Sequence, residues 1–163
     1  EGFLFTATLA DNLRYGRPQA GQAAVEQAAI QARLEGDIRG FPDGYNTLVG
    51  ERGITLSGGQ RQRTALGRAL LVDAPLLVLD DALASVDNNT AAAILEAVRQ
   101  QRQRTVLMIS HQLSAAAACD RILVLDGGRL VQQGHHNELV QRSGTYRRLW
   151  EREQAEQQLS RAA

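Results

Sequence analysis

Residues 56–60 read Leu-Ser-Gly-Gly-Gln, and this stretch most constrains what the chain can fold into. Two consecutive glycines let the backbone approach a ligand closely and adopt conformations closed to other residues. Ser57 is a favoured N-cap residue, and Gln60 three positions later completes the pattern of a capping box. Apolar residues then recur at helical spacing. We predict a glycine-rich turn that opens a helix, whose start is a natural anion site; an ordinary capped helix is the alternative.

Two apolar runs in the second half of the chain end in polar residues. Residues 76–79 are Leu-Leu-Val-Leu and lead into Asp80 and Asp81, and the run at 105–109 is followed two positions later by His111. Continuous apolar runs of this length are typical of strands buried in a parallel sheet. Strands that alternate with helices predict a parallel α/β sheet, and ligands bind such sheets at the carboxyl ends of the strands.

The remaining segments are expected to form helices and one hairpin. The helical segments are 8–15, 21–34, 88–100, 136–141 and 145–158. The runs at 121–125 and 129–132 flank Asp-Gly-Gly, which is a hairpin signal. His135 and His136 lack a further ligand at a zinc spacing, so we expect a solvated pair.

Composition excludes several classes of protein. The chain is 44% hydrophobic and 22% charged, as globular proteins are, and its 18 acidic and 18 basic residues balance. We therefore expect no nucleic-acid partner. Cys119 is the single cysteine, so an internal disulfide is excluded and a small buried hydrophobe is the expected role. No apolar stretch is long enough to span a membrane.

The absence of lysine bears on nucleotide binding. All the basic residues are arginines, whereas a phosphate-binding P-loop, G-x-x-x-x-G-K-[ST], requires a lysine. The chain therefore contains no such loop. Because Glu1 is not a start methionine, we expect the chain to be a piece of a longer protein.

The motifs, taken in order, resemble the C-terminal part of the nucleotide-binding domain of an ATP-binding cassette (ABC) transporter. The stretch at 56–60 resembles the signature motif of this family, and the strand that ends in Asp80 resembles its Walker B segment. Residues 84–87, Ala-Ser-Val-Asp, resemble the D-loop; the alternative is a helix N-terminus capped by Ser85 or Asp87, and both interpretations can hold together. His111 matches the switch histidine. The resemblance covers residues 1–150.

This resemblance implies a fold and a division of the chain. The expected fold is α/β, with the distal half of the parallel sheet of a P-loop NTPase (RecA-like) core and an α-helical ABC subdomain; the Walker A half is missing. Residues 1–66 would be the helical subdomain with the exporter loop and the signature motif. Residues 67–150 would be the distal half of the core, and 151–163 a C-terminal helical tail.

The resemblance also implies ATP and Mg²⁺ as cofactors. Asp80 takes the role of Mg²⁺ ligand, while Asp81 and His111 take the catalytic roles. The cofactor-binding residues would be Leu56, Ser57, Gly58, Gly59, Gln60 and Asp87. Active members of the family have glutamate where Asp81 stands, and aspartate is shorter by about 1.5 Å. A misplacement of about 1 Å can cost about a hundredfold in rate, so we expect weak hydrolysis at this site.

The resemblance implies the function of an exporter. The combination of a complete signature motif and a weak Walker B site resembles one half of a heterodimeric exporter. The implied partners are a second nucleotide-binding domain on a different subunit and the coupling helices of a transmembrane domain, which residues 49–53 would touch. The location would be the cytoplasmic face of the membrane. ATPase activity is expected only within the full-length protein. The alternatives are an inactive truncated remnant, an importer-type ATPase and a DNA-maintenance ATPase; the last is disfavoured because no coiled-coil heptads separate the motifs.

Overall fold

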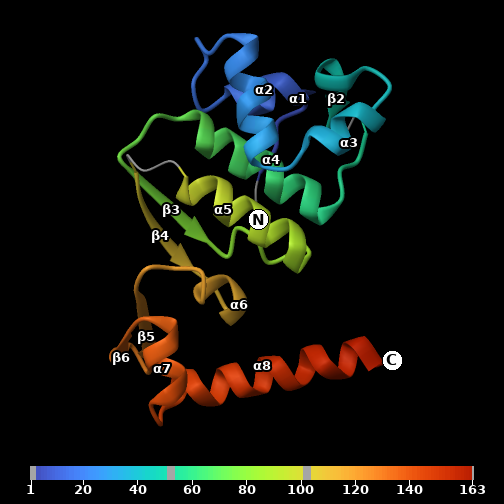
Figure 1. The fold of residues 1–163 in the computed structure, drawn as a ribbon. Coiled ribbons are helices and arrows are strands. Elements are labelled where there is room, and N and C mark those ends of the chain that lie inside the picture. Colours follow the sequence, from blue (N-terminus) through green and yellow to red (C-terminus); the bar gives the residue numbers. More distant parts are fainter. Residues whose placement is uncertain (1–2, 51–53, 101–103, 163) are drawn as a thin grey trace. The chain divides into compact units, whose positions relative to one another are not determined.

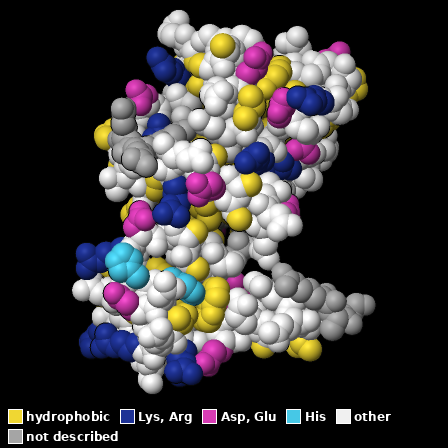
Figure 2. All heavy atoms as spheres, in the orientation of Figure 1, with side chains coloured by type: hydrophobic (Ala, Val, Ile, Leu, Met, Phe, Trp, Pro, Cys, Tyr) yellow, Lys and Arg dark blue, Asp and Glu magenta, His cyan; other side chains and the backbone are white. Residues whose placement is uncertain are grey.

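The computed structural model describes residues 3–50, 54–100 and 104–162 (Figure 1). The chain divides into two compact units, Glu1–Ile109 and Ser110–Ala163. On the face seen in Figure 2, acidic and basic side chains are interspersed. Among the described helices, none is both long and apolar enough to cross a membrane.

Two helices of the first unit pack against a third. In chain order the described helices of this unit are α1 (Leu9–Arg14), α2 (Gln22–Gln31), α3 (Glu35–Gly40), the 3₁₀ turn η1 (Gly44–Asn46), α4 (Gly58–Leu71) and α5 (Asn88–Arg99). α4 packs against both α1 and α2. Leu13 of α1 and Val25 of α2 are fully buried, and Arg68 of α4 donates a 2.9 Å hydrogen bond to the carbonyl of Asn12. α4 is therefore held on its helical neighbours by apolar burial and by a cationic donor.

Among the described residues of the first unit, four strands form two small sheets. β1 (Ala7–Thr8) pairs antiparallel with β2 (Leu48–Val49), and β3 (Leu76–Asp80) pairs parallel with β4 (Thr105–Ile109). The parallel register sets Leu76 opposite Thr105 and Asp80 opposite Ile109. Since α5 lies between β3 and β4 in the chain, the segment is a β-α-β unit, as the two apolar runs predicted.

Within the described part of the chain, the prediction that β3 and β4 are buried holds for only one face of the pair. Leu77 and Leu79 are buried, but Leu76 and Val78 are 51% and 52% exposed. On β4, Leu107 is 48% exposed. Successive side chains of a strand point to opposite faces, so only one face of this sheet packs against described parts of the chain.

The second unit contains a hairpin and three helices. Its elements are α6 (Leu113–Ala116), β5 (Ile122–Asp126), β6 (Arg129–Gly134), α7 (His136–Gln141) and α8 (Thr145–Ala162). β5 and β6 are antiparallel, and Gly127 and Gly128 adopt positive φ in the turn between them. This confirms the hairpin predicted from Asp-Gly-Gly. The core of the unit consists of Ile122, Val124, Leu139 and Tyr146.

The predicted helices are confirmed, with shifted ends. α2 stops at Gln31, short of the predicted Leu34, because Arg33 has φ 56° and cannot continue a right-handed helix. α1 begins after Thr8, whose side chain caps it by accepting a 3.1 Å hydrogen bond from the Asp11 N–H. The predicted segment 8–15 thus includes the cap as well as the helix.

Candidate functional site

A capping box forms the start of α4. The Oγ of Ser57 accepts a 3.2 Å hydrogen bond from the Gln60 N–H, and Oε1 of Gln60 accepts a 2.9 Å bond from the Ser57 N–H. The box predicted from the sequence is confirmed. We call residues 56–60 the glycine turn. Leu56, the first residue of the turn, is buried, whereas Ser57 is exposed. The N–H groups of Gly58 and Gly59 lie at the positive end of the helix dipole.

Asp37 of α3 ties the glycine turn to the helical part of the unit. Its Oδ1 accepts a 2.8 Å hydrogen bond from Nε2 of Gln60, and its Oδ2 forms a 2.6 Å ion pair with Arg63. Arg63 also donates to the carbonyl of Arg33. Both charged side chains are largely buried, at 22% and 15% exposure, so solvent screens this pair less than an exposed one. Asp37 is not predictable from the sequence as part of this site, because no local pattern relates residues 26 positions apart.

Gly59 is required by close packing inside the chain. A Cβ at this position would lie 2.8 Å from the carbonyl oxygen of Ser85, which is closer than real Cβ contacts come. At Gly58, the corresponding Cβ would lie 3.6 Å from the side chain of Ser85, in ordinary contact. Gly59 therefore lets the start of α4 lie close to the segment that follows β3. This packing requirement is independent of any ligand that the turn binds.

Gln62 joins α4 to the same segment. Its Oε1 accepts a 2.7 Å hydrogen bond from the Ser85 N–H, and its Nε2 lies 3.5 Å from the carbonyl oxygen of Asp81. The side chain of Gln62 thus joins α4 to Asp81 at the end of β3, 19 residues later in the chain. The sequence does not predict these contacts of Gln62, since a polar residue on a helix suggests only a solvated face.

Asp80 and Asp81 stand at the carboxyl end of β3, as predicted. Asp80 is exposed, and the Asp81 N–H donates a 3.0 Å hydrogen bond to the carbonyl of Ile109, which extends the β3–β4 pairing by one residue. Asp81 has φ 44°, in the left-handed region that aspartate tolerates better than most residues.

The donor set at the end of β3 suits Mg²⁺. The described residues hold no group of three or more His, Cys, Asp or Glu side chains that could form an all-protein metal site. Mg²⁺ is usually held by one or two carboxylates together with waters and substrate phosphates. The exposed carboxylate of Asp80 fits that requirement.

Asp87 caps α5. Its side chain accepts a 3.0 Å hydrogen bond from the Thr90 N–H, and this bond to the charged form lowers the pKa of the Asp87 carboxyl. Of the two caps considered from the sequence, Asp87 is the one observed, and Ser85 instead lies against Gly58 and Gly59. Leu83 and Val86 are buried and anchor the segment between them.

His111 belongs to the second unit, two residues beyond β4, and its side chain is exposed. The Oγ of Ser110 accepts a 3.0 Å hydrogen bond from the Gln112 N–H. α6 begins at Leu113, and its first N–H groups are bonded to the carboxylate of Glu153 from α8. No local sequence pattern predicts that Glu153 accepts hydrogen bonds from the start of α6.

The expectation of a solvated histidine pair is wrong for His136. Its Nδ1 lies 2.9 Å from the hydroxyl of Tyr146, and its ring meets that of Trp150 edge-on at 4.5 Å. Burial, with smaller contributions from Glu153 and Cys119, raises the pKa of Tyr146 to about 12. His136 is partly buried because α7 and α8 pack together, whereas His135 stays exposed and precedes α7.

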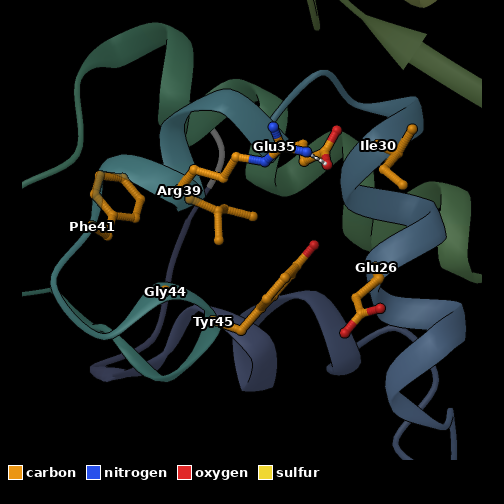
Figure 3. A pocket seen from close by; sticks show the side chains of 8 residues that line it. Glu26, Ile30, Glu35, Arg39, Phe41, Gly44 and Tyr45 are labelled. Atoms are coloured by element: carbon orange, nitrogen blue, oxygen red, sulfur yellow. Dashed lines mark hydrogen bonds and ion pairs between the residues drawn. The ribbon is translucent and has the colours of Figure 1, made fainter.

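A separate hollow lies among α2, α3 and η1 (Figure 3). Its lining residues are Glu26, Ile30, Glu35, Ile38, Arg39, Phe41, Gly44 and Tyr45. Burial, followed by the charges of Glu26 and Glu35, raises the pKa of the Tyr45 hydroxyl. None of the predicted site residues lines this hollow.

The predicted exporter loop at 49–53 is only partly described. Val49 is buried and pairs with Ala7 of β1, and Gly50 has φ 105° beside Thr6. Residues 51–53 lie outside the described part of the chain.

Comparisons with known proteins agree on one family. The family model described as "ABC transporter" matches residues 3–84, just over half of the chain. The mitochondrial potassium channel ATP-binding subunit of Xenopus tropicalis is 46% identical over 159 residues, which are 97% of this chain and 23% of that protein. The multidrug resistance-like ATP-binding protein MdlA of Escherichia coli (strain K12) is 46% identical over 161 residues, 98% of this chain and 27% of that protein.

A solved structure agrees with these relatives. The structure of a bacterial Atm1-family ABC exporter with ATP bound matches with a TM-score of 0.86 and 44% identity, over 92% of this chain and 27% of that one. The chain thus spans about a quarter of the length of the proteins that it matches.

Proposed function

Because this chain belongs to the ABC transporter family, and the proteins that it resembles include two ATP-binding proteins and an Atm1-family ABC exporter, we propose that it forms the C-terminal part of an exporter's nucleotide-binding domain. In this proposal it couples the binding and hydrolysis of ATP to transport of a substrate across a membrane. Residues 1–66 serve as the helical subdomain, 67–150 as the distal half of the RecA-like core and 151–163 as a C-terminal tail.

The observation that carries the proposal is the glycine turn fixed against the segment after β3. The capping box and Asp37 hold the turn, while Gly59 and Gln62 hold it against Ser85. An exposed helix start of this kind favours a phosphate group. We propose that Leu56 to Gln60 contact ATP held by a second nucleotide-binding domain, with Ser57, Gly58 and Gly59 nearest the phosphates.

The chain's own site is proposed to be a weak one. Asp80 would hold Mg²⁺, which neutralises the charge that develops on the transferred phosphate. Asp81 would stand where a longer acid orients water, His111 would contact the terminal phosphate, and Asp87 would lie at the boundary with the second domain. The shorter reach of Asp81 is the reason to expect slow hydrolysis here.

The half-exposed apolar face of β3 and β4 supports the proposal that a further part of the protein packs on it. Leu76, Val78 and Leu107 present this face, which is costly to leave in water. We propose that a segment of the longer protein covers it and carries the Walker A loop. Transmembrane coupling helices would contact residues 49–53, which sets the domain at the cytoplasmic face of the membrane.

The test is turnover of the full-length transporter with its partner subunit. Ser57→Ala removes a hydrogen bond to the phosphates at the competent site, and we expect ATPase activity to fall by about tenfold or more. Asp81→Ala should change it by less than about twofold, and Asp81→Glu should raise it by up to about twofold by adding a second competent site. Ser143→Ala, at an exposed serine, is the matched control.

Two outcomes would contradict the proposal. If Asp81→Ala abolished turnover as fully as removal of the partner's catalytic glutamate, the two sites would be equivalent and the asymmetry would be wrong. If no variant affected turnover, the chain would be a remnant without activity.

A further inference from the structure

Glu153 of α8 caps a helix 40 residues earlier in the chain. Its Oε2 accepts a 2.6 Å hydrogen bond from the Leu113 N–H, and its Oε1 accepts a 2.9 Å bond from the Ser114 N–H. Residue Gln112, at the N-cap position of α6, provides no side-chain cap of its own. The carboxylate from α8 therefore replaces the local cap that most helices have.

The backbone around His111 is held on both of its sides. On one side Ser110 accepts from the Gln112 N–H, and on the other Glu153 holds Leu113 and Ser114. A carboxylate that accepts two backbone N–H groups forms stronger bonds than a neutral acceptor. The direction in which the chain leaves His111 thus depends on where Glu153 stands.

α8 is itself firmly anchored. Tyr146, near its start, is 1% exposed in the core of the second unit, and its N–H donates a 2.9 Å hydrogen bond to Gln132 of β6. Trp150 packs against His136 of α7. Gln157, one turn after Glu153, donates a 3.2 Å bond to the same carboxylate and fixes its orientation. Glu153 is therefore a rigid support for α6.

We propose that Glu153 is a positioning residue that fixes residues 110–114 and thereby the place of the His111 imidazole. This inference rests on the proposed function, which assigns His111 to the terminal phosphate of ATP. It gives the C-terminal helix a part in the catalytic site, although α8 contributes no group that touches the nucleotide.

The first test is amide hydrogen exchange in the 163-residue chain. Glu153→Ala should speed the exchange of the Leu113 and Ser114 amides by about tenfold or more, since each loses a charged acceptor. Glu153→Gln keeps one acceptor oxygen and should give an intermediate rate. Glu151→Gln, which alters an exposed ion pair with Arg147 on the same helix, should leave both amides unchanged. Unchanged exchange in Glu153→Ala would overturn the proposal.

The second test is ATPase activity of the full-length transporter. The background is Asp81→Glu in this chain with the partner's catalytic glutamate removed, so that turnover comes from the chain's own site. In that background Glu153→Ala should lower kcat by about threefold to tenfold with KM little changed, and adding it to His111→Ala should cause no further loss beyond that of His111→Ala alone. If His111→Ala reduces kcat and Glu153→Ala does not, the positioning role is wrong. If neither variant affects kcat while the amides still lose protection, Glu153 is a cap only and the role proposed for His111 fails.

Discussion

The glycine turn and the β3–β4 strand pair differ in how completely the chain surrounds them. At the glycine turn, Gln60 and Arg63 both reach Asp37, and Gly59 packs against Ser85. At the strand pair, the backbone pairing runs from Leu76 to Asp80, yet side chains on one face are about half exposed. One region obtains its structure from contacts within the chain, whereas the other has a regular backbone and an unfinished core.

This difference separates the structure that backbone pairing and capping determine from the structure that burial determines. Backbone pairing and capping depend on residues that are close in sequence or on adjacent strands, and they form here. Burial of both faces of a sheet needs a further layer of structure, which the described residues do not provide. The two regions should therefore respond differently to substitution.

The largest effect is expected on the buried face of the strand pair. Leu79 is 3% exposed, and Leu79→Ala should lower the free energy of unfolding by about 2–5 kcal/mol, because it removes buried methyl groups and leaves a cavity. Leu107→Ala, the same change at a residue that is 48% exposed, should cost no more than about 1 kcal/mol. Urea unfolding of the chain measures both. Equal costs would mean that something covers the second face in solution, and the contrast would fail.

A smaller effect is expected from the glycines of the first unit. Gly59→Ala should destabilise the chain by about 1–3 kcal/mol, because the added Cβ would meet the Ser85 carbonyl at 2.8 Å. Gly36→Ala is the matched control, since no atom lies within 4 Å of its Cβ position and alanine favours a helix by about 0.5–1 kcal/mol. Thermal unfolding of both variants checks the signs. A neutral Gly59→Ala would show that the turn can move away from Ser85.

The smallest effect concerns the two helix caps. The pKa of Asp87 is lowered by its bond to Thr90, so the stabilisation from this cap is present above the ordinary aspartate pKa. It is lost as the pH falls through the lowered value. The Ser57 cap of α4 has no titrating group and should not change with pH. We expect the difference in free energy of unfolding between the wild type and Asp87→Asn to shrink as the pH falls from 6 to 3. The difference between the wild type and Ser57→Ala should stay constant over the same range.

The sequence predicted the features that depend on short-range patterns. The capping box at Ser57, the hairpin after Asp126 and the strand that ends at Asp80 all depend on residue types at fixed local spacing. Burial was misjudged on β3 and β4, because an apolar run predicts a strand without showing what covers it. The roles of Asp37, Gln62 and Glu153 were missed for a different reason: each acts on residues at least 19 positions away, and no periodicity encodes such pairs.

The backbone at Asp81 sets a limit on how this site could change during evolution. Its φ of 44° lies in a region that costs most residues about 1–2 kcal/mol, and aspartate is among the few side chains that visit it routinely. Glutamate, with its longer side chain, lacks the local hydrogen bonds that ease this conformation. Selection for the longer acid would therefore act against a local conformational preference. Under the proposed function, a return to glutamate would restore the reach of the acid at this site while adding conformational strain to the backbone, so aspartate is favoured where nucleotide binding alone is selected.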